Sequence, residues 1–250
     1  MSIIDLNADL NGVEDVQERD TLGGRLLDSS IQDFKITLAY LLKSSGGALG
    51  MHVNLENSDG AKLTDTQYIT SGNQKGNKPY YEKDGKKLPM PGLQHFNSLS
   101  QLVADKDVAA LEQKSGVIKL YNSQEGKEVP TEVIVLPELQ GKKVKAGVIR
   151  KVENKSVKQG NTYVKTNEKR EYNEVNKYFD ESGATRTELQ AKETPVFIDK
   201  WKEKYEGQVL DYFKEQANAP SAASQSGGTS NPLAGGNVAE AADDLFDEED

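Results

Sequence analysis

Apolar and polar side chains alternate most regularly between residues 34 and 55. In the first part of this stretch one face carries the apolar positions Phe34, Ile36, Leu38, Tyr40 and Leu42. Residues 44–47, Ser-Ser-Gly-Gly, break the pattern, and alternation resumes with Met51, Val53 and Leu55. A period of two is that of a strand with one buried face, and a Gly-rich break between two such runs favours a turn. The stretch therefore predicts a β-hairpin with Tyr40 in the hydrophobic core.

Weaker alternation predicts further strands along the chain. They are expected at residues 66–71, 117–122 and 172–179, and residues 131–137 are apolar on both faces. A strand that is apolar on both faces is typical of the middle of a sheet, so residues 131–137 predict a central strand.

Two regions follow a helical period instead. One or two helices are expected over residues 93–114, where the apolar positions are Phe96, Leu99, Leu102 and Val103. A second helix is expected to begin after Thr194, an N-cap residue, with Pro195 at its first position, and to end near Lys214. Its apolar stripe contains Trp201, which we expect in the core. The chain is thus predicted to be mainly β with some α.

Composition divides the chain into four parts. Residues 1–23 have scattered acidic residues and no sustained period, which predicts a flexible N-terminal arm. Residues 24–216 form the folded domain. Residues 217–237 are rich in Ala, Ser, Gly, Asn and Pro, which predicts a flexible linker. Residues 238–250 are predicted to be a disordered acidic tail, with Leu245 and Phe246 as its large apolar side chains.

Charge is segregated along this chain of net charge -9. The span 141–172 holds only three acidic residues, Glu153, Glu168 and Glu171, against ten basic ones. These are Lys142, Lys143, Lys145, Arg150, Lys151, Lys155, Lys158, Lys165, Lys169 and Arg170. An acidic tail in the same chain as a basic segment could contact that segment or bind a basic partner protein. The alternative is that the tail only aids solubility.

Lysines and tyrosines are interleaved in two places, as single-stranded nucleic acid requires, because rings stack on bases and ammonium groups contact phosphates. The strand at residues 141–152 places Lys143, Lys145 and Lys151 on one predicted exposed face, with Gly147 and Ile149 between them. Tyr163 and Lys165 share a face after the following turn. The segment 72–92 combines Lys75, Lys78, Lys83, Lys86 and Lys87 with Tyr80 and Tyr81. The alternative interpretation of this segment is a solvated loop whose tyrosines cover the core.

Several classes of chemistry have no motif here. The chain has no Cys, which excludes disulfides and thiol catalysis, and its two histidines, His52 and His95, have no carboxylate at ligand spacing in sequence. There is no phosphate-binding P-loop and no Gly-x-Ser-x-Gly elbow. We therefore expect no enzyme, metal site or cofactor. No apolar run is long enough for a membrane span, and the acidic start is unlike a signal peptide, so the expected location is the cytoplasm.

The strand-rich body, the Lys- and Tyr-dotted strands, the Gly/Ser/Pro linker and the ending Asp-Asp-Leu-Phe-Asp-Glu-Glu-Asp resemble the single-stranded DNA-binding proteins of bacteria and of tailed bacteriophages. The resemblance implies an OB-fold-like antiparallel barrel with helical insertions and a C-terminal helix, which coats single-stranded DNA in replication and recombination. It places the protein in the host cytoplasm. Bacterial tails usually end in an apolar pair, whereas here Asp247 to Asp250 follow Phe246, so the likeness is to the phage proteins.

The interleaved lysines and tyrosines and the resemblance, which matches Tyr163 and the lysines around it to the binding face and Leu245 and Phe246 to the tail, together predict two sets of site residues. The DNA-binding set is Lys75, Lys78, Tyr80, Tyr81, Lys86, Lys87, Lys143, Lys145, Arg150, Lys151, Lys155, Lys158, Tyr163 and Lys165. The tail set is Asp243, Asp244, Leu245, Phe246, Asp247, Glu248, Glu249 and Asp250, which would recruit a polymerase, helicase or primase and cover the DNA groove when DNA is absent. A phage assembly protein and an RNA-binding transcription accessory protein are the alternatives.

Overall fold

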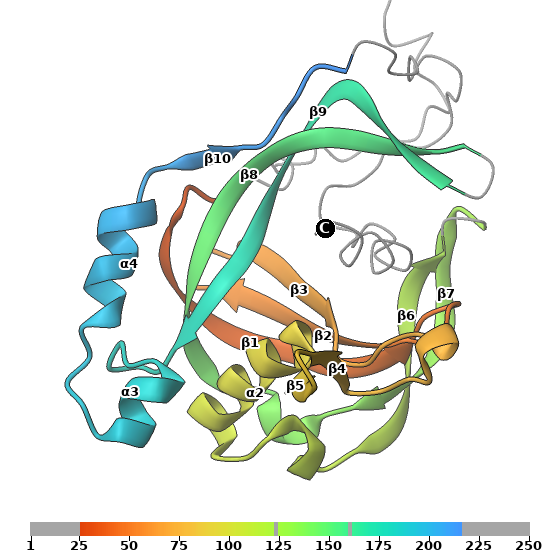
Figure 1. Cartoon of the computed structure of the whole chain (residues 1–250). Helices are drawn as coiled ribbons and strands as arrows, with labels where there is room; N and C mark the ends of the chain where they lie inside the picture. The colour runs from red at the N-terminus through yellow and green to blue at the C-terminus, as the bar shows by residue number, and fades with distance from the viewer. Residues whose placement is uncertain (1–25, 123–124, 160–161, 217–250) are drawn as a thin grey trace, which may run out of the picture.

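A computed structural model describes residues 26–122, 125–159 and 162–216. In these residues the chain is mainly antiparallel β, with three α-helices (Figure 1). The predicted N-terminal arm, linker and acidic tail all lie outside the described residues.

An eight-stranded sheet forms the body. It begins with β1 (Ser30–Lys43), β2 (Leu49–Asn57) and β3 (Lys62–Tyr68), each antiparallel to the one before. It continues with β6 (Lys114–Asn122), β7 (Lys127–Val135), β8 (Lys143–Gln159), β9 (Thr162–Phe179) and β10 (Val209–Asp211). The hairpin predicted over residues 34–55 is confirmed as β1 and β2.

One long strand, β1, pairs with three other strands of the sheet. One edge pairs with β2 along most of its length, while the other edge pairs with β8 at residues 30–35 and with β7 at Tyr40 and Leu41. The strand β8 pairs with β9 on its other side, and β10 lies parallel to β8 beyond the end of β1. In Figure 1 the paired strands β8 and β9 arch over the body and extend past it.

The helices pack against this body in two places. The helix α2 (Pro91–Ala104) packs against β3, β8 and β9 and buries Phe96 and Leu99 in the main core. The helices α3 (Arg186–Ala191) and α4 (Phe197–Tyr205) follow β9, and α4 buries Trp201 in a second cluster with Ile149 and Phe179. Short 3₁₀ turns lie at Asn73–Lys75, Val108–Ala110 and Pro137–Leu139. The helices expected over 93–114 and after Pro195, and a buried Trp201, are thus confirmed.

A β-bulge corrects the predicted face of Tyr40. The register of β1 against β2 passes from Ile36 opposite Leu55 to Leu38 opposite Asn54, so Thr37 is an extra residue. Beyond it the core side chains are Ala39 and Leu41, in contact with Phe34 and Ile36 of the first half. Tyr40 is buried, but it points to the opposite face of the sheet.

Two element boundaries also differ from the predictions. The helix α4 ends at Tyr205, and not near Lys214, because Gly207 adopts a left-handed conformation (φ 70°) and the chain continues as β10. The strand predicted at residues 131–137 is β7, which pairs with β6 along its whole length and with β1 only at its last two residues. It is therefore not a central strand over most of its length.

Candidate nucleic-acid interface

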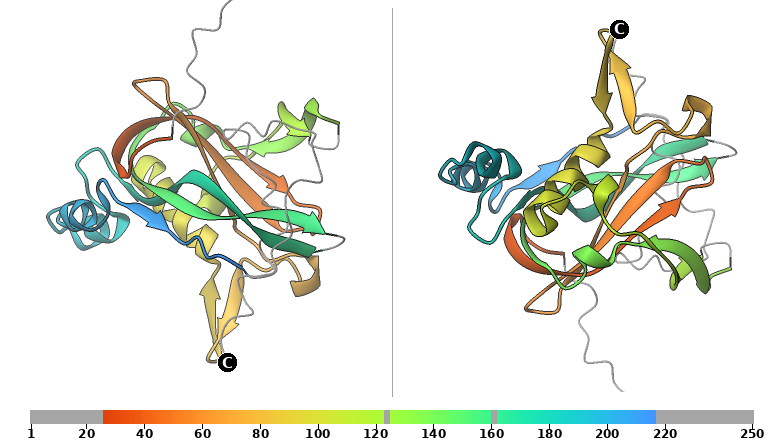
Figure 2. Two further views of the ribbon diagram at one scale, coloured as in Figure 1. Left: turned by 90° about the horizontal axis from the view of Figure 1, so that it is seen from above. Right: turned by 90° about the horizontal axis from the view of Figure 1, so that it is seen from below.

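The segment 72–92 forms a separate β-hairpin. Its strands are β4 (Tyr80–Lys83) and β5 (Lys86–Pro89), joined by Asp84 and Gly85, both in the left-handed region (φ 53° and 70°), as a two-residue type I′ turn requires. No ladder joins them to the eight-stranded sheet within the described residues. Figure 2 shows the hairpin standing out from the body, on the side opposite the β6–β7 hairpin.

Tyr80 lies between two ammonium groups on this hairpin. The Nζ atom of Lys87 is 4.8 Å and that of Lys78 is 5.6 Å from the centre of its ring. The exposed lysines Lys83 and Lys86 flank the turn. No described carboxylate lies within ion-pair distance of Lys78, Lys83, Lys86 or Lys87, so their charges are available to an anion. Tyr81 is half-buried, and Lys75 lies in the preceding 3₁₀ turn.

The basic residues of β8 and β9 are arranged differently, because six of them have carboxylate partners. Arg150 lies 2.7 Å from Glu171 and 3.5 Å from Asp28, and Lys151 lies 2.7 Å from Glu174. The other pairs are Lys145–Asp33, Lys155–Glu168, Lys169–Asp211 and Arg170–Glu153, at 2.6 to 3.9 Å. The hydrogen bond and charge of Glu171 raise the pKa of Arg150. A phosphate would have to displace these carboxylates.

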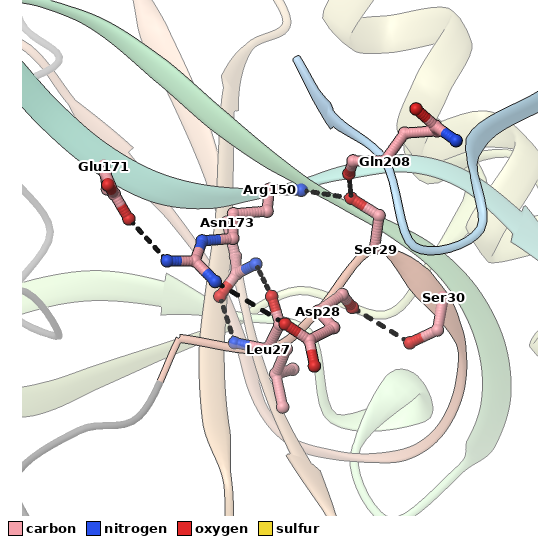
Figure 3. Close-up of polar contacts among 8 residues, drawn as sticks. All are labelled: Leu27, Asp28, Ser29, Ser30, Arg150, Glu171, Asn173 and Gln208. Carbon is pink, nitrogen blue, oxygen red and sulfur yellow. Dashed lines mark hydrogen bonds and ion pairs between the residues drawn. The ribbon is translucent and has the colours of Figure 1, made fainter. Parts of the chain in front are cut away.

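Figure 3 shows the hydrogen bonds and ion pairs around Arg150. The Oγ atom of Ser29 accepts the backbone N–H of Arg150 at 2.8 Å and donates to the carbonyl of Gln208. The side chain of Asn173 pairs with the backbone of Leu27 through two hydrogen bonds of 2.8 and 2.7 Å. These contacts attach the start of β1 to β8, β9 and the chain before β10, and the guanidinium of Arg150 spans the same junction.

The prediction that residues 143–151 present an exposed face is wrong for the two residues in its middle, Gly147 and Ile149. Gly147 and Ile149 are buried, because Trp201 of α4 packs directly on them. Lys145 and Lys151 are partly buried beside their carboxylate partners, and only Lys143 is fully exposed. The helix α4 thus covers the face that was expected to meet solvent.

The remaining predicted residues lie toward the far end of the β8–β9 pair. Lys155 and Lys165 are exposed, and the ring of Tyr163 is 40% exposed. The backbone of Lys158 pairs with Tyr163, but its side chain lies outside the described part, as do all eight tail residues. The hairpin residues and the β8–β9 residues therefore belong to two separate ladders and do not form one continuous strand face.

An aromatic group that the sequence did not reveal lies on the face of β1, β2 and β3 opposite the core. The rings of Tyr40 and His52 are stacked, with centroids 4.7 Å apart and planes at 4°. Tyr68 of β3 is paired with Gly50, and its ring edge lies over this glycine, where a Cβ atom would be 3.6 Å from it. We call Tyr40, His52 and Tyr68 the aromatic platform. Tyr40 belongs to this platform only because of the bulge at Thr37. The alternation of side chains in the sequence gives no sign of that bulge.

The platform is uncharged at neutral pH. Burial lowers the pKa of His52 to about 4, against a smaller opposing effect of the Asp65 charge, and Nδ1 of His52 is hydrogen-bonded to the Thr66 hydroxyl at 2.9 Å. Burial also raises the pKa of Tyr68 to about 12. Tyr40 is only 5% exposed, so the partly exposed His52 and Tyr68 are the neutral rings of the platform that a base could contact, and they contribute no attraction for phosphate.

Other kinds of site were sought in the part of the chain that the structure describes. No cluster of three His, Asp or Glu side chains there could hold a metal ion. No helix in the same residues has the length and apolar character needed to cross a lipid bilayer. A scan against protein-family models and a search of curated proteins both find no match to the chain.

Proposed function

We propose that this protein is a binding protein, not an enzyme, and that it coats single-stranded DNA during phage replication or recombination. The observation that carries the proposal is the protruding β4–β5 hairpin with Lys78 before it, where two lysines lie near the ring of Tyr80 and four lysines have no carboxylate partner among the described residues. An aromatic ring among unpaired ammonium groups supplies both elements of sequence-independent strand binding, stacking and phosphate contact.

The strand order supports an OB-type barrel. The strands β1, β2 and β3 follow one another, α2 follows β3, and β8 and β9 return to pair with β1. The open side lies between β3 and β9, where the hydroxyl of Tyr178 donates to Asp65 at 2.6 Å. A five-stranded, partly open barrel of this order binds nucleic acid on the face of its second and third strands and at its loops. The aromatic platform occupies that face.

The proposed mechanism combines two terms. Stacking on Tyr80 and the aromatic platform adds about 1–3 kcal/mol per base. Each lysine that neutralises a phosphate makes the fall of log K with log salt steeper by about 0.7. The β8–β9 cations contribute less, because exchanging a carboxylate for a phosphate leaves the number of ion pairs unchanged.

The acidic tail is proposed to bind replication proteins. Its residues Asp243 to Asp250 lie outside the described residues, so the argument rests on their charge and on Leu245 and Phe246. Among the described cations, the unpaired hairpin lysines are the natural intramolecular contact for these acids, which would leave the tail free once DNA occupies the hairpin.

The test is a titration of labelled oligo-dT followed by fluorescence anisotropy, with duplex DNA and oligo-U of equal length as competitors. Trp201 is 1% exposed and lies on the helix side, so an external label is the better reporter. The double substitution Lys86→Gln/Lys87→Gln should reduce the salt slope by about 1.4, from two contacts of ~0.7 each. The matched control is Lys200→Gln/Lys204→Gln on α4.

Tight binding of oligo-dT with little competition by duplex or oligo-U supports the proposal. Preference for oligo-U would replace it with RNA binding. Absence of binding to every nucleic acid would favour an assembly protein, and equal salt slopes for the hairpin and control variants would remove the hairpin from the interface.

A further inference from the structure

A second candidate site lies where α2 and α3 meet the end of β9 (Figure 1). It is an open pocket of about 400 Å³, within the range of small-ligand sites. Its polar lining includes Gln94, His95 and Ser98 of α2, Asn176 and Lys177 of β9, and Arg186 of α3. None of these residues belongs to the proposed DNA interface.

The lining is cationic in a chain that is acidic overall. Lys177 and Arg186 contribute positive charge, and no Asp or Glu lines the pocket, although the chain has 40 acidic residues against 31 basic ones. Both cations have a neighbour outside the lining: the Nζ atom of Lys177 is 5.6 Å from the ring centre of Phe197 on α4, and a phosphate would compete with Asp107 for Arg186. Asp107 is 3.7 Å from Arg186, and Asp65 lies buried behind His95. The remaining lining side chains supply hydroxyl and amide groups.

Three of the lining side chains are held in place from outside the pocket. The Nε atom of Arg186 donates to Gln101 at 2.8 Å, and Nε2 of His95 lies 2.7 Å from the carboxylate of Asp65. The amide oxygen of Asn176 accepts the indole N–H of Trp201 at 2.8 Å.

These anchors leave two donor groups unused. Nδ2 of Asn176 and the Nη1 group of Arg186 have no hydrogen-bond partner among the described residues. Donors fixed before a ligand arrives cost less entropy to use, which is the usual construction of an anion site.

We propose that this pocket binds a phosphate group. A planar guanidinium, an ammonium group and neutral amide donors around one opening match the charge and the acceptor oxygens of phosphate, and the absence of lining carboxylates removes the repulsion that would oppose it. The phosphate can come from free phosphate, a mononucleotide or the 5′ end of a DNA strand. The inference does not depend on DNA coating, since the two sites share no residue.

The test measures binding of inorganic phosphate, a mononucleotide and a 5′-phosphorylated dT oligomer to the full chain by calorimetry, with the unphosphorylated oligomer as reference. The informative variant is Gln94→Glu, which adds one carboxylate to the wall and breaks no hydrogen bond of the Gln94 side chain among the described residues. Gln113→Glu makes the same chemical change at an exposed position outside the pocket.

We expect at least one of the three phosphate ligands to bind and Gln94→Glu to raise its Kd about tenfold, while Gln113→Glu leaves it unchanged. The ligand with the lowest Kd identifies where the bound phosphate comes from. If the 5′-phosphorylated oligomer binds more tightly than the unphosphorylated one, the phosphate is that of a DNA end. Arg186→Lys should also weaken binding, because it removes the guanidinium fork. No binding of any phosphate ligand, or equal Kd values in Gln94→Glu and wild type, overturns the proposal.

Discussion

Replacing Gly147 with alanine tests whether the middle of β8 is covered by α4. A Cβ atom at residue 147 would lie 2.6 Å and 2.7 Å from two carbons of the Trp201 indole. Carbon atoms in contact prefer about 3.5–4.0 Å, so the ring or the strand would have to move by about 1 Å. Neither yields easily, since Trp201 is hydrogen-bonded to Asn176 and Gly147 is paired on both sides, with Ile31 and Lys177.

Overpacking a tight interior costs about 1–3 kcal/mol, and we expect the upper end, about 3 kcal/mol, because both sides of this contact are fixed. Urea denaturation followed by circular dichroism measures the free energy of unfolding, and an unchanged m-value shows that the transition is the same. In the double variant Gly147→Ala/Trp201→Leu the collision is absent, so the two costs should not add. A loss below about 0.5 kcal/mol for Gly147→Ala would refute the packing of α4 on β8.

Two further predictions concern a buried carboxylate and the aromatic platform. Burial of Glu188 opposes its ionisation, but the backbone N–H groups of Thr185, Val196 and Phe197 together lower its pKa from the ordinary 4.5 to about 2. Ionised Glu188 therefore stabilises the fold above pH 4.5, and this contribution is lost as the pH falls toward 2. In Glu188→Gln the free energy of unfolding, measured by urea titrations, should depend less on pH between these two values. On the platform, Tyr68→Ala should weaken oligo-dT binding by about 1–3 kcal/mol, while Tyr68→Phe and the exposed control Tyr121→Ala leave anisotropy titrations unchanged.

The alternation of side chains predicted the β1–β2 hairpin but not the bulge within it. Up to Ile36 the apolar positions of β1 are those that enter the core, and Thr37 then shifts the phase by one residue. Both Leu38 and Ala39 are apolar, so either phase fits the sequence after the bulge. The choice is made by β2, whose Val53 and Met51 pair with Ala39 and Leu41, and pairing across strands is not visible in one strand's pattern.

The charge count over residues 141–172 failed for a related reason. It compared ten basic residues with the three acidic ones in the same span, yet four carboxylates that neutralise them come from elsewhere, Asp28, Asp33, Glu174 and Asp211. The antiparallel strand β9, the parallel strand β10 and the residues at the start of β1 bring these acids beside the basic residues. The hairpin at residues 80–89 is a local structure, so its three lysines stay beside the two acidic residues of the same segment, Glu82 and Asp84, and an excess of one positive charge remains.

This difference changes where nucleic acid would first attach. Ion pairs between exposed side chains contribute little to stability, about 0–1 kcal/mol each, so the β8–β9 carboxylates do not lock their partners, but they do cancel the field that would attract a phosphate from a distance. The hairpin carries Lys83, Lys86 and Lys87 against Glu82 and Asp84, with no ion pair among them in the described residues, and it stands out from the body (Figure 2). A strand captured there would extend toward the aromatic platform, where stacking replaces charge as the main attraction. On this order of events, neutralising the hairpin lysines slows association, whereas substituting Tyr68 speeds dissociation. Stopped-flow anisotropy of the two variants separates these effects, and a hairpin variant that changed only the dissociation rate would contradict the order.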